Sequence, residues 1–397
     1  MEYTLVTLLY WAFAALGGLL VLTKILRYGS RPQKFPPDGP ITTMKLGGQN
    51  LFLLNDPAVI RDLLEKRSNN YSCRPDLYAR HFGDNLNIAL RDNDEIWRRQ
   101  RKMYHVRLNV RSADRYLPYQ HFDSLQLLND LVTNPEGWVQ HVQRYTASIS
   151  STLLYGWRTP RTSTGYVKDL LEAMVLFPDV QAEAQKELDD VIGSGRLPTW
   201  DDRANLPYIR GVVEETLRWA PSPLSAAVPH SAKEDDVYNG MVIPKGSMVM
   251  INVWTLNHER FANARDFDPM RYNAESTLTE NNAISQDSPK RLHFTFGAGR
   301  RVCPGFHVAE RNLFIAISRI LWGFSISRAR GVDGEFTVIN RDAVTPGMIV
   351  RPEDFECEIK PRDSIRETLV KEQWQAAEKD LDSEGNFTPE FIQASFT

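Results

Sequence analysis

Phe296-Gly-Ala-Gly-Arg-Arg-Val-Cys303-Pro304-Gly305 is the stretch of sequence that decides the fold of this chain. It places one cysteine between a glycine-rich loop and an apolar helical pattern, and it predicts a helix whose first residue is Pro304, where a missing N–H costs nothing. A thiolate at this place would face the positive end of the helix dipole, which lowers the pKa of a thiol. The glycines let the backbone approach a flat, bulky group because they have no Cβ atom. Arg301 supplies a cation for a bound anion.

This stretch resembles the cysteine loop of the cytochrome P450 family, the haem-thiolate monooxygenases. The matching positions are Phe296, Gly299, Arg301, Cys303 and Gly305. A buried, inert cysteine in a glycine turn is the alternative interpretation, because buried cysteines are common. The resemblance implies haem b as the cofactor, with Cys303 as the axial ligand of the iron and the other four positions in the cofactor-binding loop. A thiolate ligand pushes electron density that favours O–O cleavage.

A second pattern, Glu215-Thr-Leu-Arg218, lies in a segment that predicts a helix from Pro207. The glutamate and the arginine are three residues apart and therefore share one helical face. A pair of this kind on a surface contributes well under about 1 kcal/mol and needs no function. In the family that the chain resembles, such a pair locks with a later arginine, and Arg271 stands at the matching place. The resemblance implies that Glu215, Arg218 and Arg271 hold the fold and are not catalytic.

The third pattern is Trp97-Arg-Arg-Gln-Arg101-Lys102. On a helix, Trp97 and Arg101 lie on one face, so an indole N–H and a guanidinium group could bind one carboxylate. A basic, solvated helix face is the simpler interpretation of the run by itself. The resemblance implies that Trp97, Arg101 and Arg301 bind the haem propionates, with His230 as a further candidate, although a lone histidine is more often a satisfied polar residue. A net charge of −3 and the lack of interleaved aromatic residues argue against nucleic-acid binding.

The amino-terminal segment predicts a membrane anchor independently of the family. Residues 3–23 carry no charge and are long enough to cross the core of a bilayer. The basic residues that follow are Lys24, Arg27, Arg31 and Lys34. Positive charge after the span places the rest of the chain in the cytosol, and a cleaved signal peptide would need a basic start and a shorter apolar core. We therefore expect a single-pass signal anchor at residues 1–34, a Pro/Gly hinge at 35–40, a cytochrome P450-like domain at 41–397, and the endoplasmic reticulum membrane as the location.

Helical patterns dominate the rest of the sequence, which predicts a mainly α fold with a small β region. Strands are expected near residues 44–54 and 239–253, with further strands between 336 and 360. Helices are expected from 178 to about 192 and from 304 to about 321, with a peripheral tail after Arg362. The cysteines Cys73, Cys303 and Cys357 form no disulfide framework, which suits a reducing compartment.

Two parts of the family's pattern are missing from the chain. The first helix that the family places after the hinge is absent, and Ala173 is joined directly to Met174 where the family inserts several helices. One of these helices carries an Ala/Gly-Gly-x-Asp/Glu-Thr motif that delivers protons to oxygen, and this motif does not occur in the sequence. We therefore expect an internally truncated cytochrome P450 fold.

The expected function is oxidation of a lipophilic small molecule, in fungal secondary metabolism, by a monooxygenase that uses O₂ and an NADPH-dependent reductase. A catalytically impaired haem-binding pseudoenzyme, or a truncated product, is the alternative. These two interpretations differ in whether the missing helices are needed for turnover.

Overall fold

The computed structural model of the chain describes residues 39–46, 48–81, 84–159, 167–272 and 291–396. These residues form two compact units, and each unit is described by itself. The first takes its residues from the ranges 1–94, 228–252 and 298–301, and the second from 95–227, 253–297 and 302–397. Most of the secondary structure in the described residues is helical and the sheets are small, which confirms the predicted mainly α fold with a small β region.

The predicted membrane span at residues 3–23 and most of the predicted hinge lie outside the described residues. Within the ranges that the structure does describe, no helix has both the length and the apolar character that crossing a bilayer requires.

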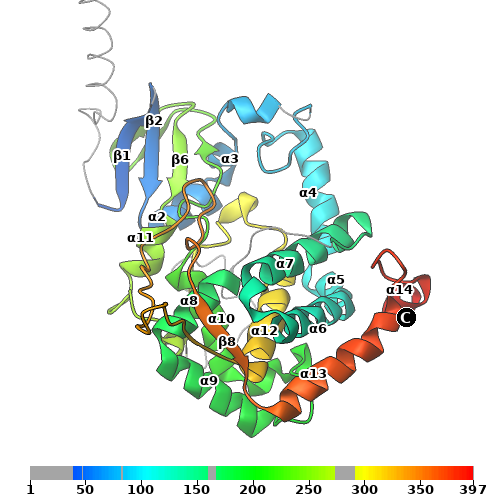
Figure 1. Cartoon of the computed structure of the whole chain (residues 1–397). Coiled ribbons are helices and arrows are strands. Elements are labelled where there is room, and N and C mark those ends of the chain that lie inside the picture. Colours follow the sequence, from blue (N-terminus) through cyan, green and yellow to red (C-terminus); the bar gives the residue numbers. More distant parts are fainter. Residues whose placement is uncertain (1–38, 47, 82–83, 160–166, 273–290, 397) are drawn as a thin grey trace, which may run out of the picture. The chain divides into compact units, whose positions relative to one another are not determined.

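A four-stranded sheet forms the centre of the first unit (Figure 1). Its strands are, in order, β1 (Ile41–Leu46), β2 (Gln49–Leu54), β6 (Met248–Ile251) and β3 (His230–Ser231). Strands β1 and β2 are antiparallel, with Ile41 opposite Leu54, whereas β2 and β6 run parallel. Phe52, Leu54 and Val249 are fully buried, so one apolar surface holds the sheet to the rest of the unit.

The predicted Asn-Gly turn joins two further strands of this unit. Strand β4 (Asp236–Tyr238) pairs with β5 (Met241–Ile243), and Asn239 and Gly240 both have a positive φ, of 50° and 78°. A two-residue hairpin turn of this hand favours these two residue types. The helices of the unit are short: α2 (Pro57–Ile60), η1 (Arg61–Lys66), α3 (Ser68–Tyr71), η2 (Tyr78–His81) and η9 (Gly299–Arg301).

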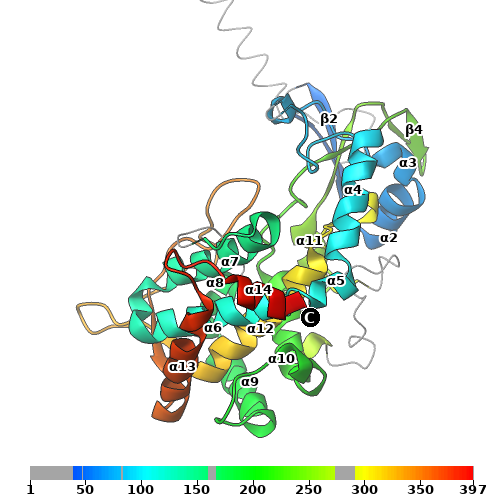
Figure 2. The ribbon, with the colours of Figure 1, turned by 90° about the vertical axis from the view of Figure 1, so that its right-hand side faces the viewer.

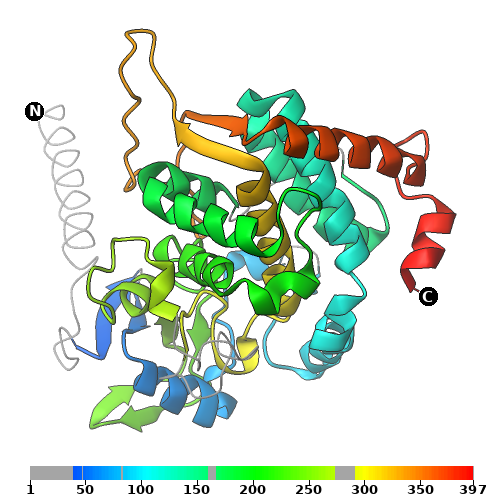
Figure 3. The same ribbon diagram turned by 90° about the horizontal axis from the view of Figure 1, so that it is seen from below.

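The second unit is built from helices around α12 (Phe306–Gly323), with α6 (Leu117–Thr133) on one side of it and α9 (Pro178–Val191) and α10 (Pro207–Trp219) on the other (Figure 3). Residues 313–323 of α12 are buried all round, and this explains why its apolar pattern covers more than one face. The first half of the unit consists of α4 (Glu95–Leu108), α5 (Val110–Asp114), α6 (Leu117–Thr133), η3 (Pro135–Gly137), α7 (Trp138–Tyr155), α8 (Val167–Leu176) and α9 (Pro178–Val191). The second half adds η4 (Trp200–Asn205), α10 (Pro207–Trp219), α11 (Val253–His258), η5 (Pro269–Tyr272), β7 (Phe324–Arg328), β8 (Cys357–Pro361), α13 (Ser364–Ala377), η10 (Glu378–Asp380) and α14 (Pro389–Phe396).

Helices α9 and α10 confirm two sequence predictions almost to the residue. Both begin at a proline in the first helical position, where the ring suits the helical φ. Helix α9 is followed by Gly193, whose φ of 71° ends the helix, and α10 ends two residues before Pro221.

Helix α12 does not begin where the sequence predicted. Pro304 lies in a turn, Gly305 is the N-cap residue, and the N–H of Ala309 makes a helical bond to the carbonyl of Gly305. The N–H of Cys303 is instead bonded to the carbonyl oxygen of Phe296 at 2.9 Å, which folds the cysteine back onto its own loop. The helix therefore starts three residues after the cysteine.

The strands predicted between residues 336 and 360 are wrong apart from β8. Strand β8 pairs with β7, but residues 329–356 form a long loop (orange in Figure 3) that contains only isolated bridges, such as Val344 with Pro352. Prolines cannot donate to a ladder, and Gly347 has a φ of 135°. These residues interrupt the apolar runs that suggested strands.

The peripheral tail predicted after Arg362 is also wrong. Helix α13 packs along α6, and the chain then turns back into α14 (Figure 2). Phe387 and Phe391 lie against aromatic residues of α6. The ring centroids of Phe387 and Phe122 are 5.0 Å apart, and those of Phe387 and Tyr119 are 5.1 Å apart. Arg158 lies over the rings of Phe122 and Phe387 and binds Asp123 at 2.6 Å. This aromatic contact makes the tail part of the core.

Replacing Phe387 with alanine should therefore lower the free energy of unfolding by about 2–4 kcal/mol, because a buried aromatic side chain leaves a cavity. Urea unfolding followed by tryptophan fluorescence measures the loss. Ile392→Ala is the matched control, since Ile392 lies in the same segment but is 37% exposed, and it should cost less than about 1 kcal/mol. Equal losses in the two variants would show that the tail is a frayed end after all.

The predicted internal junction lies inside helix α8. Ala173 and Met174 are consecutive residues of this helix, and both side chains are fully buried in the core. The junction is therefore bridged by continuous helix, whereas residues 160–166 before it are outside the described part of the chain.

Candidate functional site

Cys303 lies in a half-buried loop of the second unit, close to one cation and one N–H group. Burial raises the pKa of its thiol, while the backbone N–H of Gly305 and the charge of Arg101 lower it, and the net direction is upward. The sequence predicted a lowered pKa from the helix dipole. This prediction is wrong for the protein alone, because α12 starts three residues later and desolvation of the thiolate outweighs the two favourable interactions.

The glycines of this loop have different roles. A Cβ atom placed on Gly297 or on Gly305 would meet no atom within 4 Å, so the chain leaves open space beside both. A Cβ atom on Gly299 would instead lie 2.2 Å from the carbonyl oxygen of Leu64 in the first unit, which contains both residues. Gly299 is therefore required for close packing against η1, and the predicted cofactor approach fits Gly305.

Helix α4 brings Trp97 and Arg101 to one face, as the sequence predicted. Trp97 is 4% exposed, and the guanidinium of Arg101 donates to the carbonyl oxygen of Val302, next to Cys303. Burial lowers the pKa of Arg101 and the nearby Cys303 raises it. The ring of Phe296 packs 6.1 Å from that of Phe306 at the start of α12, so it supports the loop from the side of the core.

His230 and Arg301 belong to the first unit, where they lie near a third basic residue, Arg74. Arg301 donates to the carbonyl of Ser72 at 2.9 Å, and Arg74 donates to the carbonyls of residues 228 and 229 at 2.7 and 2.8 Å. Nδ1 of His230 is bonded to the carbonyl of Tyr71 at 2.8 Å. Burial, together with nearby arginines, lowers the pKa of His230 to about 3 and that of Arg74 to about 9.

These observations fit a flat group that carries carboxylates. The side chains of Arg74 and Arg301 donate to carbonyl groups, and an anion nearby would reduce the cost of burying Arg74. The sulfur of Cys303 and the open space beside Gly305 suit a metal-containing ring. The residues predicted to bind the haem belong to both units. Trp97, Arg101 and Cys303 lie in the second unit, and His230 and Arg301 lie in the first.

Sequence reasoning missed Arg74. It stands in the segment Tyr71-Ser-Cys-Arg74-Pro75, where one arginine among polar residues looks like an ordinary surface charge. Its burial depends on contacts with residues more than 150 positions away, which no local pattern reveals.

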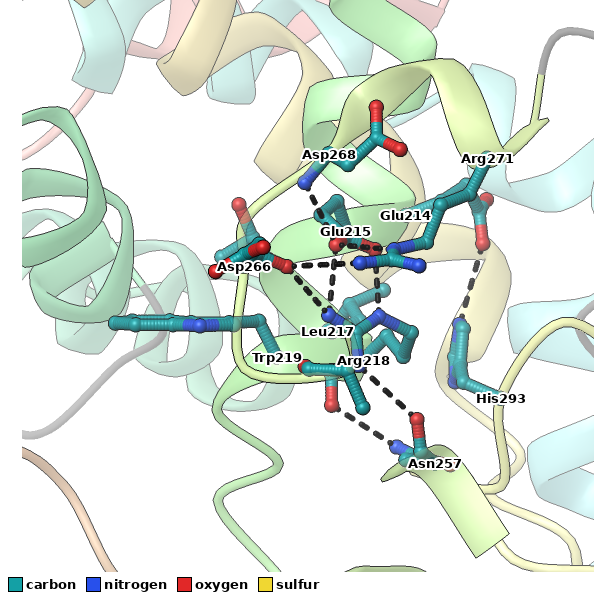
Figure 4. Close-up of polar contacts among 12 residues, drawn as sticks. Glu214, Glu215, Leu217, Arg218, Trp219, Asn257, Asp266, Asp268, Arg271 and His293 are labelled. Carbon is teal, nitrogen blue, oxygen red and sulfur yellow. Dashed lines mark hydrogen bonds and ion pairs between the residues drawn. The ribbon is translucent and has the colours of Figure 1, made fainter. Parts of the chain in front are cut away.

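The three residues predicted to hold the fold meet in one buried network (Figure 4). Glu215 and Arg218 are fully buried and joined by two hydrogen bonds of 2.6 and 2.7 Å, and Arg271 binds the same carboxylate at 3.1 Å. Arg218 also donates to the carbonyl oxygens of Asn257 at 3.1 Å and Ala264 at 2.9 Å. The network ties residues 257–271 to helix α10, and every charge in it has an opposite charge or several carbonyl partners.

Comparison with known proteins identifies the family. The cytochrome P450 family model matches residues 160–347. The cytochrome P450 monooxygenase peniB of Penicillium patulum is 31% identical over 85% of this chain and 81% of that protein. The chain belongs to the cytochrome P450 family. A further cytochrome P450 monooxygenase, virE of Hypocrea virens, is 28% identical over 92% of each chain. A solved structure of a zebra fish cytochrome P450 with abiraterone has a TM-score of 0.67 and 19% identity, and covers 82% of this chain and 96% of that one.

As a cytochrome P450 monooxygenase, the protein is an oxidoreductase with a haem iron ligated by cysteine. Its alignment with virE extends over 511 positions, more than the 397 residues of this cytochrome P450. The relative therefore carries residues that this chain lacks.

Proposed function

We propose that this cytochrome P450 oxidises a lipophilic small molecule in fungal secondary metabolism, with Cys303 as the axial ligand of its haem iron. The observation that carries the proposal is the loop around Cys303, where a half-buried sulfur lies beside the Gly305 N–H and the Arg101 guanidinium, with open space next to Gly305. The fungal monooxygenases virE and peniB support the general activity.

When bound, the haem supplies the cleavage of O₂ and the insertion of one oxygen atom into the substrate. The residues of the chain bind the haem and stabilise the thiolate that ligates its iron. The N–H of Gly305 and the charge of Arg101 stabilise the Cys303 thiolate against the cost of burial. Trp97, Arg101 and Arg301 are the residues that we propose to bind the propionates, with His230 as a further candidate. Glu215, Arg218 and Arg271 keep residues 257–271 in place.

The electrons come from an NADPH-dependent reductase at the endoplasmic reticulum, where residues 1–34 serve as a single-pass anchor. Helix α4 offers the reductase an exposed basic face that includes Arg98, Arg99 and Lys102. Such a face attracts an acidic partner and raises the rate of encounter.

A haem-binding pseudoenzyme is the second candidate, and one feature of α8 favours it. This helix, Val-Lys-Asp-Leu-Leu-Glu-Ala-Met-Val-Leu, contains neither threonine nor glycine, and the oxygen-activating motif of the family occurs nowhere in the sequence. Without these proton donors and the helices around them, water would enter the site and reduce coupling.

The test compares this chain with a variant in which the block missing after Ala173 is restored from peniB. With the same reductase and a fluorogenic coumarin ether as a lipophilic probe, both should consume NADPH. This chain should return most of the electrons as peroxide, and the restored variant should yield at least about tenfold more product per NADPH.

Cys303→Ser is the control and should consume no NADPH above background. Consumption equal to this control in both proteins would contradict the proposed function. Equal coupling in both would show that the missing helix is dispensable and would end the pseudoenzyme alternative.

A further inference from the structure

Helix α8 buries two carboxyl groups for which the described residues supply no hydrogen-bond or ion-pair partner. Asp169 and Glu172 are each 3% exposed and lie three residues apart on one face of the helix. Among the described residues, neither carboxyl group has a hydrogen bond or an ion pair. Burying a carboxyl group in this way is costly, and native proteins rarely leave one unsatisfied. The described residues therefore leave both carboxyl groups free to form hydrogen bonds with a ligand.

Both residues line a cavity of about 370 Å³ within the second unit. This volume lies in the range of small-molecule sites. The other walls are largely apolar and include Trp219, Leu224, Val350 and Pro352. The two carboxyl groups share this cavity with four other charged residues that line it, Arg265, Arg341, Asp342 and Arg351.

Two of the cations near this cavity are paired with carboxylates, whereas Arg351, which also lines it, makes no ion pair among the described residues. Lys168 binds Asp354 at 2.6 Å, and Arg265 binds Asp342. Arg341 donates to the carbonyl oxygen of Arg265 at 3.3 Å.

The charged residues that line the cavity differ in how far they are exposed to solvent. Arg341 and Asp342 are exposed and Arg351 is half-buried, whereas Asp169 and Glu172 are buried. The two acids are therefore the most buried charges of the cavity, and the arginines that line it are more exposed.

We propose that this cavity selects lipophilic molecules that carry a protonated amine, whose ammonium group donates hydrogen bonds to Asp169 and Glu172 while its apolar body contacts Trp219 and Leu224. The proposal rests on the function proposed above, because it names the substrate class of that monooxygenase. Charge-assisted hydrogen bonds are strong where water is excluded, and they fix the orientation of a bound molecule.

The affinity for an amine should rise with pH. Burial raises the pKa of Glu172 to about 7, although Lys168 and Arg265 lower it, and Asp342 raises it. Burial and Glu172 also raise the pKa of Asp169, which Lys168 lowers. Alkylamines keep their proton up to about pH 10. Between pH 6 and 8 Glu172 therefore ionises while the ligand stays charged, so the binding of the amine becomes tighter.

Three probes with one skeleton test the proposal on the haem-loaded protein: 4-phenylbutylamine, 4-phenylbutan-1-ol and 4-phenylbutanoate. Calorimetry at pH 7.5 should give a Kd for the amine at least about tenfold below that of the alcohol, with the acid weakest. Asp169→Asn and Glu172→Gln, which keep the shape of the side chain, should each remove most of this preference and leave the affinity for the alcohol unchanged. Glu183→Gln on α9 is the matched control, because Glu183 is exposed and outside the cavity.

A preference for the acid, or equal affinities for all three probes, would overturn the proposal. So would a long-wavelength shift of the haem absorption by the amine that persists in the Asp169→Asn/Glu172→Gln double variant, because the amine would then bind the iron. The carbon monoxide spectrum is a separate readout. A thiolate-type spectrum without amine preference rejects the substrate class alone, whereas its absence rejects the proposed haem assignment whatever the probes do.

Discussion

Replacing Cys303 with serine abolishes the red-shifted absorption band that carbon monoxide gives with the reduced haem protein. The band requires a thiolate on the iron, and a serine hydroxyl does not supply the same electron density. Of the three cysteines, Cys303 alone combines the glycine loop with a nearby N–H and a cation that lower its pKa. The measurement is a difference spectrum of the reduced protein with and without carbon monoxide.

Cys73→Ser and Cys357→Ser are the matched controls and should keep the band. Burial raises the pKa of Cys73 to about 11 and that of Cys357 to about 12, so neither thiol forms a thiolate readily. A band that survives in Cys303→Ser but disappears in one of the other variants would move the ligand to that residue.

Arg218→Ala should be the most destabilising single substitution in the network of α10. It leaves the fully buried carboxylate of Glu215 without its two shortest hydrogen bonds, and breaking a buried pair from one side costs about 3–5 kcal/mol. The expected result is a large fall in the urea midpoint, or protein that is found only in the insoluble fraction.

Two further variants serve as controls for Arg218→Ala. Arg98→Ala removes an exposed arginine from α4 and should change the unfolding free energy by less than about 0.5 kcal/mol. The double variant Glu215→Met/Arg218→Leu removes both buried charges and should be more stable than Arg218→Ala alone. If Arg218→Ala behaves like Arg98→Ala, the network does not hold the fold.

Local signals in the sequence were sufficient for the elements that carry their own start and stop residues. Helices α9 and α10 begin at prolines, and the β4–β5 hairpin turns at Asn239-Gly240, so each could be predicted from a short window. The network of Glu215, Arg218 and Arg271 came from the resemblance to the family, because a spacing of three predicts only a shared helical face.

Features that depend on burial or on distant residues could not be predicted. The pKa of Cys303 moves upward because of desolvation, which the spacing of glycines does not reveal. Arg74 has the sequence surroundings of a surface residue, and the apolar residues of the tail, such as Phe387 and Phe391, are interspersed with many charged ones. Periodicity within one segment carries no information about which other segment will cover it.

The contact between the tail and α6 also constrains how the protein is made. Helix α6 is synthesised in the first third of the chain, but the rings that cover Tyr119 and Phe122 belong to residues 387 and 391, close to the carboxyl end. A ribosome adds about 5–20 residues per second, so this apolar face waits uncovered for many seconds and through the release of the finished chain. Chaperones would therefore be expected to bind the nascent chain at α6, and an early stop codon before Phe387 would leave that face permanently open.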